Sequence, residues 1–213
     1  YINEILDIKL NFNNNKINRF LHYGYKSLFK DNETFFKEVK HFEKGKIAII
    51  DKNLNFNLRS YWSIKDHKKK QTHTLTEHIT NTKNLLVQSV GLRMIADTPV
   101  ALSLSGGIDS GAICSIASKV FGKKLETFSI IDTDNRYNES NLIDATAKDC
   151  GVKNHKINIS KHEDYLSILD KSINQTNYPI TTITDLILYQ LTSKIKEYGY
   201  KVCLSGSGGD ELF

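Results

Sequence analysis

Cysteine, proline and tryptophan are scarce in this chain of 213 residues, which has three cysteines, two prolines and one tryptophan. Cys114, Cys150 and Cys203 show no Cys-x-x-Cys spacing, and each lies among apolar residues. We therefore expect buried, reduced thiols of the kind found in reducing compartments. The seven histidines also lack metal-ligand spacing, so the sequence favours no zinc site.

Long apolar runs are missing as well, and none approaches the roughly 20 residues that span a bilayer. We therefore expect no membrane partner and, with the reduced thiols, a cytoplasmic protein. No signal peptide is visible, but its absence means little because the true N-terminus is missing. The net charge is +5, but the lysines are scattered, with one small cluster at residues 67–70. A nucleic-acid binder would show a denser patch with interleaved aromatics, so no nucleic-acid partner is expected.

A glycine-rich turn, SGGIDS at residues 105–110, follows the short apolar run 100–104. Apolar residues then recur at helical spacing over 112–120. Strand, glycine turn and helix form a phosphate cradle, because backbone N–H groups at a helix N-terminus point at one anion. Asp109 adds a carboxylate that can hold Mg²⁺. An ordinary strand-to-helix turn rich in serine and glycine is the plainer alternative.

The turn differs from the P-loop of kinases, which needs a lysine that reaches the β- and γ-phosphates. No lysine lies between Lys83 and Lys119. A loop without it suits pyrophosphate as the leaving group, with attack at the α-phosphate.

A second stretch, VCLSGSGGDE at residues 202–211, has the same order of apolar strand, glycine turn and acidic residues. Two such turns at the carboxyl ends of two parallel strands can face one crevice. Asp109 and Asp210 would then be paired carboxylates, suited to Mg²⁺ and phosphate oxygens. For Asp210 and Glu211, the alternative is an acidic first turn that stabilises a helix dipole.

With SLSGGIDSG and LSGSGGDELF, the chain resembles the synthetase half of glutamine-dependent asparagine synthetases, in the PP-loop ATP pyrophosphatase superfamily. The segments LRMIADTPVALSLSGG, LETFSI, YNES and SKIKEYGYKVCLSG agree with that family. The resemblance covers about residue 70 to the end. A weaker one, NETFFKEVKHFEKGKIAIID and LRSYW within residues 32–62, is similar to the closing part of the family's N-terminal glutaminase domain.

Helical and strand patterns alternate from residue 75 onward, which predicts an α/β fold, a parallel sheet with helices on both faces. The resemblance implies the adenine nucleotide alpha hydrolase-like, PP-loop form of that fold, preceded by a partial β-rich tail of an Ntn-type glutaminase domain. Residues 1–66 are expected to hold that tail and linker, and residues 67–213 the ATP-binding domain. Expected strands are 46–50, 58–62, 100–104, 125–131, 156–159 and 202–204, and expected helices include 75–90, 142–150, 165–173 and 187–195. Residues 13–15 are expected to form a loop, and residues 63–72 a polar linker.

The resemblance also implies roles for individual residues. Asp109 and Asp210 would be the catalytic, Mg²⁺-binding carboxylates, and Leu104 and Ile130 would contact the nucleotide base. For those two, ordinary strand core is an equally good interpretation. The remaining nucleotide- and pyrophosphate-binding residues would be Ser105, Gly106, Gly107, Ser110, Ser205 and Gly206.

The implied activity is that of a ligase that uses ATP and Mg²⁺ to convert aspartate to asparagine. The aspartate carboxylate attacks the α-phosphate, which gives a β-aspartyl-adenylate and pyrophosphate, and glutamine-derived ammonia then displaces AMP. Ser207 departs from the family, where this residue is usually acidic and is thought to help the ammonia step, since a serine of ordinary pKa is no general base. Residues 177–179 depart more mildly, because many relatives have an acidic residue before the proline.

Three alternatives therefore stay open. The first is a relative that amidates another carboxylic acid, in surface-polysaccharide or secondary metabolism. The second is a catalytically silent nucleotide-binding module, and the third a tRNA-modifying PP-loop enzyme. The intact Asp109 and Asp210 argue against the second, and the lack of a basic patch or extra cysteines argues against the third.

The chain begins at Tyr1 rather than methionine and stops at Phe213, inside the second motif. We therefore expect a fragment of a longer protein. The family's glutaminase cysteine and its C-terminal catalytic lysine would lie outside it, and a homodimer through the glutaminase domain is an option that the resemblance leaves open.

Overall fold

The computed structural model describes residues 9–67, 73–158 and 165–210. The chain divides into two compact units. The first comprises Tyr1–His73 and Ile173–Thr181, and the second comprises Thr74–Ser172 and Thr182–Phe213. Helix α6 (Tyr165–Thr176) begins in the second unit and ends in the first. That residues 1–66 belong to a glutaminase domain stays a prediction.

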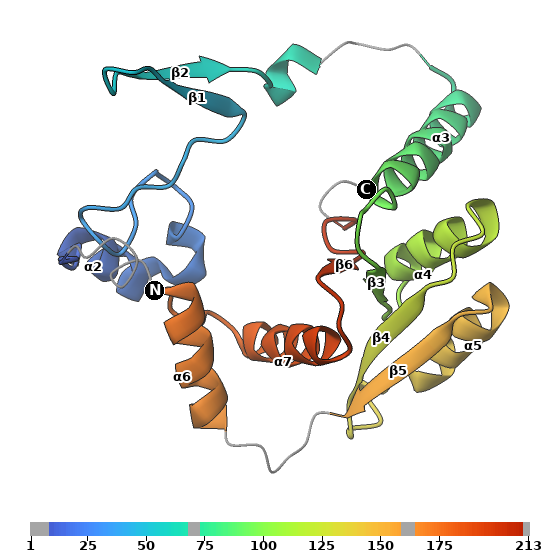
Figure 1. Ribbon diagram of the computed structural model, residues 1–213. Coiled ribbons are helices and arrows are strands. Elements are labelled where there is room, and N and C mark those ends of the chain that lie inside the picture. Colours follow the sequence, from blue (N-terminus) through green and yellow to red (C-terminus); the bar gives the residue numbers. More distant parts are fainter. Residues whose placement is uncertain (1–8, 68–72, 159–164, 211–213) are drawn as a thin grey trace. The chain divides into compact units, whose positions relative to one another are not determined.

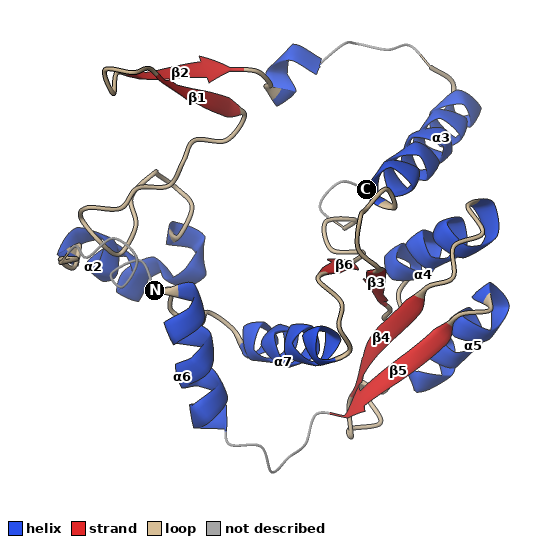
Figure 2. Cartoon of the chain, viewed as in Figure 1, coloured by secondary structure: helices blue, strands red, loops and turns tan. Residues whose placement is uncertain are grey.

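The second unit is built on a four-stranded parallel sheet (Figure 2). Its strand order is β5 (Lys153–Asn158), β4 (Glu126–Ile131), β3 (Val100–Ser103) and β6 (Val202–Leu204). This confirms the predicted parallel sheet, although β5 begins three residues before the expected start at Lys156. Ile159, the last residue expected in that strand, lies outside the described residues.

Helices cover both faces of this sheet, as the sequence predicts. Leu102 and Leu104 pack on one face against α4 (Ile108–Ser115) and α5 (Ser140–Cys150), which lie side by side in Figure 1. Ala101 and Phe128 pack on the other face against α7 (Ile183–Glu197). Successive residues of a strand point to opposite faces, and at β3 and β6 both faces are apolar, which is why residues 100–102 and 202–204 read as continuous apolar runs.

Local capping signals set the ends of the helices. At the start of α3 (Leu75–Arg93), Thr74 and Glu77 form a reciprocal capping box, which satisfies backbone N–H groups of the first turn. Helix α5 ends at Gly151, whose φ of 64° is the left-handed conformation that glycine adopts at little cost. Helix α4 continues into the π-helical segment η3 (Ile116–Val120).

The first unit contains α2 (Asn14–Tyr23), the short 3₁₀ helices η1 (Gly24–Ser27) and η2 (Ile64–His67), and an antiparallel hairpin of β1 (Lys46–Ile50) and β2 (Phe56–Ser60). The expected loop at residues 13–15 is wrong in part. Asn13 caps α2 by accepting a hydrogen bond from the Lys16 N–H at 3.3 Å, so the two following asparagines are helical. The second hairpin strand lies two residues earlier than expected, and part of the expected linker is helical.

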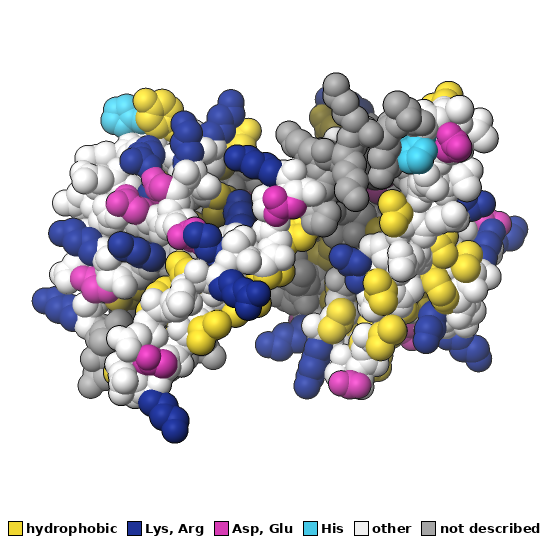
Figure 3. Space-filling view, turned by 90° about the horizontal axis from the view of Figure 1, so that it is seen from above, with side chains coloured by type: hydrophobic (Ala, Val, Ile, Leu, Met, Phe, Trp, Pro, Cys, Tyr) yellow, Lys and Arg dark blue, Asp and Glu magenta, His cyan; other side chains and the backbone are white. Residues whose placement is uncertain are grey.

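The thiols of the protein are unpaired, and its visible surface carries charges of both signs (Figure 3). All three cysteines are free, and burial raises the pKa of the Cys114 thiol to about 12. Lysine and arginine side chains are spread over the visible face in Figure 3, interspersed with acidic ones. Within the described part of the chain, no helix combines the length and apolar character needed to cross a membrane.

Leu102 tests whether the sheet core carries the stability of the second unit. This side chain is fully buried, so Leu102→Ala should lower the free energy of unfolding by about 2–5 kcal/mol. Leu85→Ala, on an exposed face of α3, is the matched control and should change it by less than about 0.5 kcal/mol. Urea unfolding followed by circular dichroism measures both. Equal effects would show that the core has been assigned incorrectly.

Candidate functional site

The first glycine loop connects β3 to α4 and is held in shape by two serines. The Ser110 hydroxyl, buried in the first turn of α4, accepts a hydrogen bond from the Ser105 N–H at 3.1 Å. The two hydroxyl oxygens lie 2.9 Å apart, and Ser105 Oγ also accepts from the Gly107 N–H at 3.2 Å. These serines therefore fix the loop conformation from within, so that its backbone is preorganised.

The second glycine loop follows β6 and lies directly against the first. Because β3 and β6 are parallel neighbours, with Leu102 level with Leu204, both loops leave the same edge of the sheet. A Cβ at Gly206 would lie 2.7 Å from the backbone nitrogen of Ser110, and one at Gly209 would lie 2.5 Å from Cγ of Asp109. Such contacts are shorter than any real Cβ makes, so the second loop approaches Asp109 this closely only because it lacks side chains there.

The two loops line one cavity of about 660 Å³. Apart from Leu104 and Ile130, every site residue predicted from the sequence lies on its wall, and so does Ser207. The lining residues are Ser103, Ser105, Gly106, Gly107, Ile108, Asp109, Ser110, Ser205, Gly206, Ser207 and Asp210. The structure thus brings together two segments that are about one hundred residues apart in the sequence.

Leu104 and Ile130 are not among the residues that line this cavity. The Leu104 side chain is 1% exposed and packs in the core between the sheet and α4. Its backbone is engaged too, because its N–H donates to the Phe128 carbonyl at 2.9 Å and its carbonyl accepts from the Ser129 hydroxyl at 2.5 Å. Ile130 packs on the opposite face of the sheet. Their contact with a nucleotide stays a prediction.

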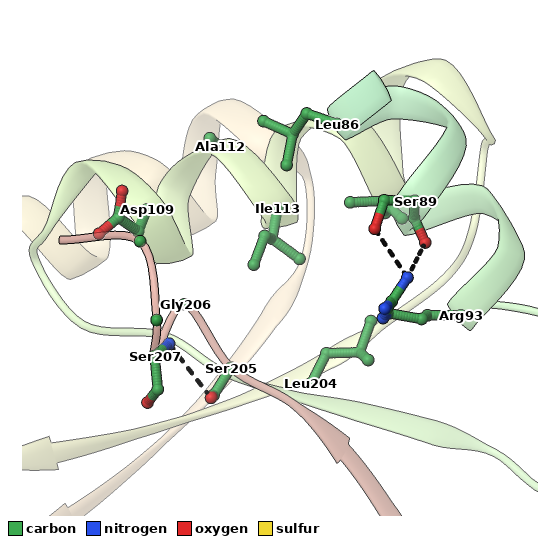
Figure 4. A pocket seen from close by; sticks show the side chains of 13 residues that line it. Leu86, Ser89, Arg93, Asp109, Ala112, Ile113, Leu204, Ser205, Gly206 and Ser207 are labelled. Atoms are coloured by element: carbon green, nitrogen blue, oxygen red, sulfur yellow. Dashed lines mark hydrogen bonds between the residues drawn. The ribbon is translucent and has the colours of Figure 1, made fainter. Parts of the chain in front are cut away.

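A second cavity, of about 340 Å³, adjoins the first between α3, α4 and the second loop (Figure 4). Leu86, Ile113 and Leu204 give it an apolar wall. Arg93 lies at one end, where its guanidinium donates hydrogen bonds to the Ser89 carbonyl at 3.1 Å and the Ser89 hydroxyl at 2.7 Å. Asp109 is shared by both cavities. Sequence reasoning did not single out Arg93, since one arginine near a helix end carries no motif.

Glu139 is the other residue that sequence reasoning missed. Its carboxylate accepts a hydrogen bond from the Gly106 N–H at 3.0 Å, although it stands 33 residues away in the sequence. The YNES segment that contains Glu139 was a signal of family likeness, but nothing in the segment indicates which loop its glutamate contacts.

The two aspartates fit the demands of Mg²⁺. In the described residues, no group of three or more histidine, cysteine, aspartate or glutamate side chains is placed to hold a metal. Mg²⁺ commonly takes only one or two protein carboxylates and completes its shell with water and substrate phosphates. Asp109 and Asp210, on opposite loops of one cavity, supply such a donor set.

Comparison with known proteins identifies the family. The asparagine synthase family model matches residues 81–213, more than half of the chain and the whole of both glycine loops. The chain therefore belongs to the asparagine synthase family.

The sequence identity to individual relatives is modest. The chain is 31% identical over 175 residues to asparagine synthetase [glutamine-hydrolyzing] 1 of Bacillus subtilis, covering 82% of this chain and 27% of that protein. It is 26% identical over 199 residues to the amidase chyE of Penicillium rubens, covering 86% of this chain and 30% of that protein. The chain thus spans less than a third of the length of these relatives. A solved NH3-dependent NAD synthetase from Campylobacter jejuni is similar over 62% of this chain and 58% of its own, with 19% identity and a TM-score of 0.41, and adds no weight to the assignment.

Gly209 tests the close approach of the two loops. Gly209→Ala places a methyl group 2.5 Å from the Asp109 carboxylate carbon, so that carboxylate should move by about 1 Å to restore normal contact. Gly111→Ala, in α4, is the control, because its Cβ would meet nothing closer than 3.8 Å. Crystal structures of both variants measure the shift. An unmoved Asp109 in the first variant would contradict the packing described here.

Proposed function

We propose that this chain is the nucleotide-binding part of an ATP-dependent, AMP-forming amide ligase that converts aspartate to asparagine. The observation that carries the proposal is the cavity in which the loop after β3 and the loop after β6 close around Asp109. Family membership supports it, since both loops lie within the matched residues.

In the first step, the side-chain carboxylate of aspartate attacks the α-phosphorus of ATP. A bond forms between carboxylate oxygen and phosphorus, the bond to the β-phosphate oxygen breaks, and pyrophosphate leaves. This activates a carboxylate that would otherwise be a poor electrophile. The loop N–H groups at the start of α4 bind the departing pyrophosphate, and no lysine is needed for a terminal phosphate.

Asp109 and Asp210 would hold Mg²⁺, which when bound neutralises phosphate charge. The protein's own contribution is positioning. The internal hydrogen bonds of Ser105 and Ser110 keep the loop in its binding shape before the nucleotide arrives. The glycines of the second loop allow Asp109 to lie close to that loop.

In the second step, ammonia attacks the acyl carbon of the adenylate, and AMP leaves while a proton is lost. Ser207 lies on the cavity wall, where the family usually has an acidic residue. Its hydroxyl can hydrogen-bond an intermediate, but at its ordinary pKa it cannot remove the proton. Glutamine hydrolysis by the expected glutaminase domain would supply the ammonia.

A relative that amidates a different carboxylic acid is the second candidate. Ser207 favours it, because the change falls at the ammonia step and leaves the adenylation residues intact. The likeness to a protein named as an amidase is consistent with a broader range of substrates. A silent nucleotide-binding module is less well supported, since both aspartates remain on the cavity wall.

The proposal also includes the partners, the location and the oligomeric state of the enzyme. Its partners would be the small molecules ATP, aspartate and glutamine or ammonia, in the cytoplasm, where ATP and reduced thiols coexist. A homodimer through the glutaminase domain is part of the same proposal.

Asp109→Asn tests the enzyme assignment. The full-length protein with ATP, Mg²⁺, ammonium and aspartate should release pyrophosphate, and this variant should slow the release by about 10²-fold or more, since it removes a charge at the reacting phosphates. Asp149→Asn is the control, because Asp149 is exposed and pairs only with Lys119 at 2.6 Å among the contacts described. Unchanged release from Asp109→Asn would exclude the proposed role. Release that depends on another acid, with no asparagine formed, would favour the second candidate.

Ser207→Glu tests the departure from the family. Restoring a carboxylate should raise asparagine formed per pyrophosphate released, by up to about 10²-fold if a base is what the ammonia step lacks. Ser207→Ala is the control and separates the loss of the hydroxyl from the gain of the acid. Quantifying asparagine and pyrophosphate in one reaction gives the ratio. A ratio that Ser207→Glu leaves unchanged would show that this position does not limit the ammonia step.

A further inference from the structure

A carboxylate of the chain itself occupies the first glycine loop. The Gly106 N–H donates to Oε2 of Glu139 at 3.0 Å. The contact is close along the whole glutamate side chain, because a Cβ on Gly106 would lie 2.8 Å from Cβ and 3.1 Å from Oε2 of Glu139. The glutamate stands just before α5, on the segment that follows β4.

The Gly106 N–H is one of the backbone N–H groups of the first glycine loop that would bind a phosphate. Gly106 lines the larger cavity together with Asp109 and Asp210. Backbone N–H groups in a strand–glycine turn–helix arrangement bind anions, and they do not distinguish a carboxylate oxygen from a phosphate oxygen. Glu139 therefore makes the charge-assisted hydrogen bond that a phosphate oxygen would otherwise make.

We propose that Glu139 is a built-in competitor for the first glycine loop, which occupies the Gly106 N–H in the free protein and must be displaced when the pyrophosphate group of the nucleotide binds. This inference rests on the proposed function, because it takes a nucleotide phosphate as the ligand of the loop. It adds a residue that sets how strongly that loop binds anions.

The surroundings of Glu139 allow the displacement. The residue is exposed, and its side chain makes no capping hydrogen bond to α5. Once it leaves the loop, the carboxylate can be solvated by water at little cost, since exposed charges interact weakly. If it stayed, its charge would lie beside that of the incoming phosphates, and like charges at such distances repel.

The competition has a consequence for selectivity. A side chain tethered next to its partner acts at a high effective concentration, which a single small anion in solution does not match. A polyphosphate brings several oxygens to several N–H groups at once and so displaces the carboxylate. Glu139 would thus keep the loop free of simple anions while admitting pyrophosphate.

The test is isothermal titration of the full-length protein with inorganic pyrophosphate in excess Mg²⁺. Glu139→Ala removes the competitor and should lower the dissociation constant about three- to tenfold, the net effect of one typical hydrogen bond. Glu139→Gln keeps a weaker, neutral acceptor, so its dissociation constant should lie between those of Glu139→Ala and the wild type. Asp144→Ala is the matched control, because it removes one negative charge from α5, the helix that Glu139 precedes, where Asp144 pairs with Lys156 at 2.7 Å. It should leave the dissociation constant within twofold of wild type.

A second readout does not depend on any ligand. The Gly106 amide resonance of the free protein should shift in Glu139→Ala and stay in place in Asp144→Ala, because only the first variant removes its acceptor. Wild-type binding that Glu139→Ala leaves unchanged or weakens would overturn this inference alone. Equal tightening by Asp144→Ala would also overturn it, since general charge would then explain the gain. Absence of pyrophosphate binding in all variants would instead overturn the proposed function, and this inference with it.

Discussion

The parallel pairing of β3 with β6 is the contact on which the rest of the site depends. Three paired positions, from Val100 with Val202 to Leu102 with Leu204, bring the ends of the two strands level. Both glycine loops then leave the sheet on one edge, as the carboxyl ends of parallel strands do. The apolar faces of these strands hold the pairing, because α4 and α5 pack on one side and α7 on the other. A shift in this register would move the two loops apart and abolish the cavity between them, although each loop could keep its own conformation.

Once the loops are adjacent, the absence of side chains decides how closely they approach. Gly206 and Gly209 lie so near the start of α4 that a methyl group on either would collide with Ser110 or Asp109. The first loop is held in shape for a different reason, because the hydroxyl groups of its serines form hydrogen bonds within the loop. One loop is thus set by hydrogen bonds and the other by close packing, and Asp109 lies where the two meet.

The charged side chains in and beside the larger cavity are carboxylates. Asp109 and Asp210 line the cavity, and the Glu139 carboxylate contacts the loop that borders it. A cavity lined by carboxylates disfavours a polyanion unless a cation accompanies it, because like charges repel. The backbone N–H groups of the first loop and a divalent cation together would offset this repulsion.

The sequence by itself determined the kind of fold and most of the residues that line the cavity between the two glycine loops. Alternating apolar strands and amphipathic helices predicted the parallel sheet covered on both faces, and local signals such as Gly151 marked where helices end. The serine- and glycine-rich turns predicted which residues would meet in the cavity, because loop chemistry is encoded within a few consecutive residues. The sequence predicted the ends of the strands less accurately. Where a strand stops is decided by burial and by pairing, and both depend on neighbouring segments.

Only the tertiary structure decided the contacts between distant segments. The sequence allows Leu104 to be a base-contacting residue or core, and only the packing shows that its side chain is part of the core. Arg93 and Glu139 reach the site from other elements, and no local pattern connects them to it. Capping and turn preferences act over a few bonds, whereas the bond from Gly106 to Glu139 forms only when the sheet has brought the ends of β3 and β4 together.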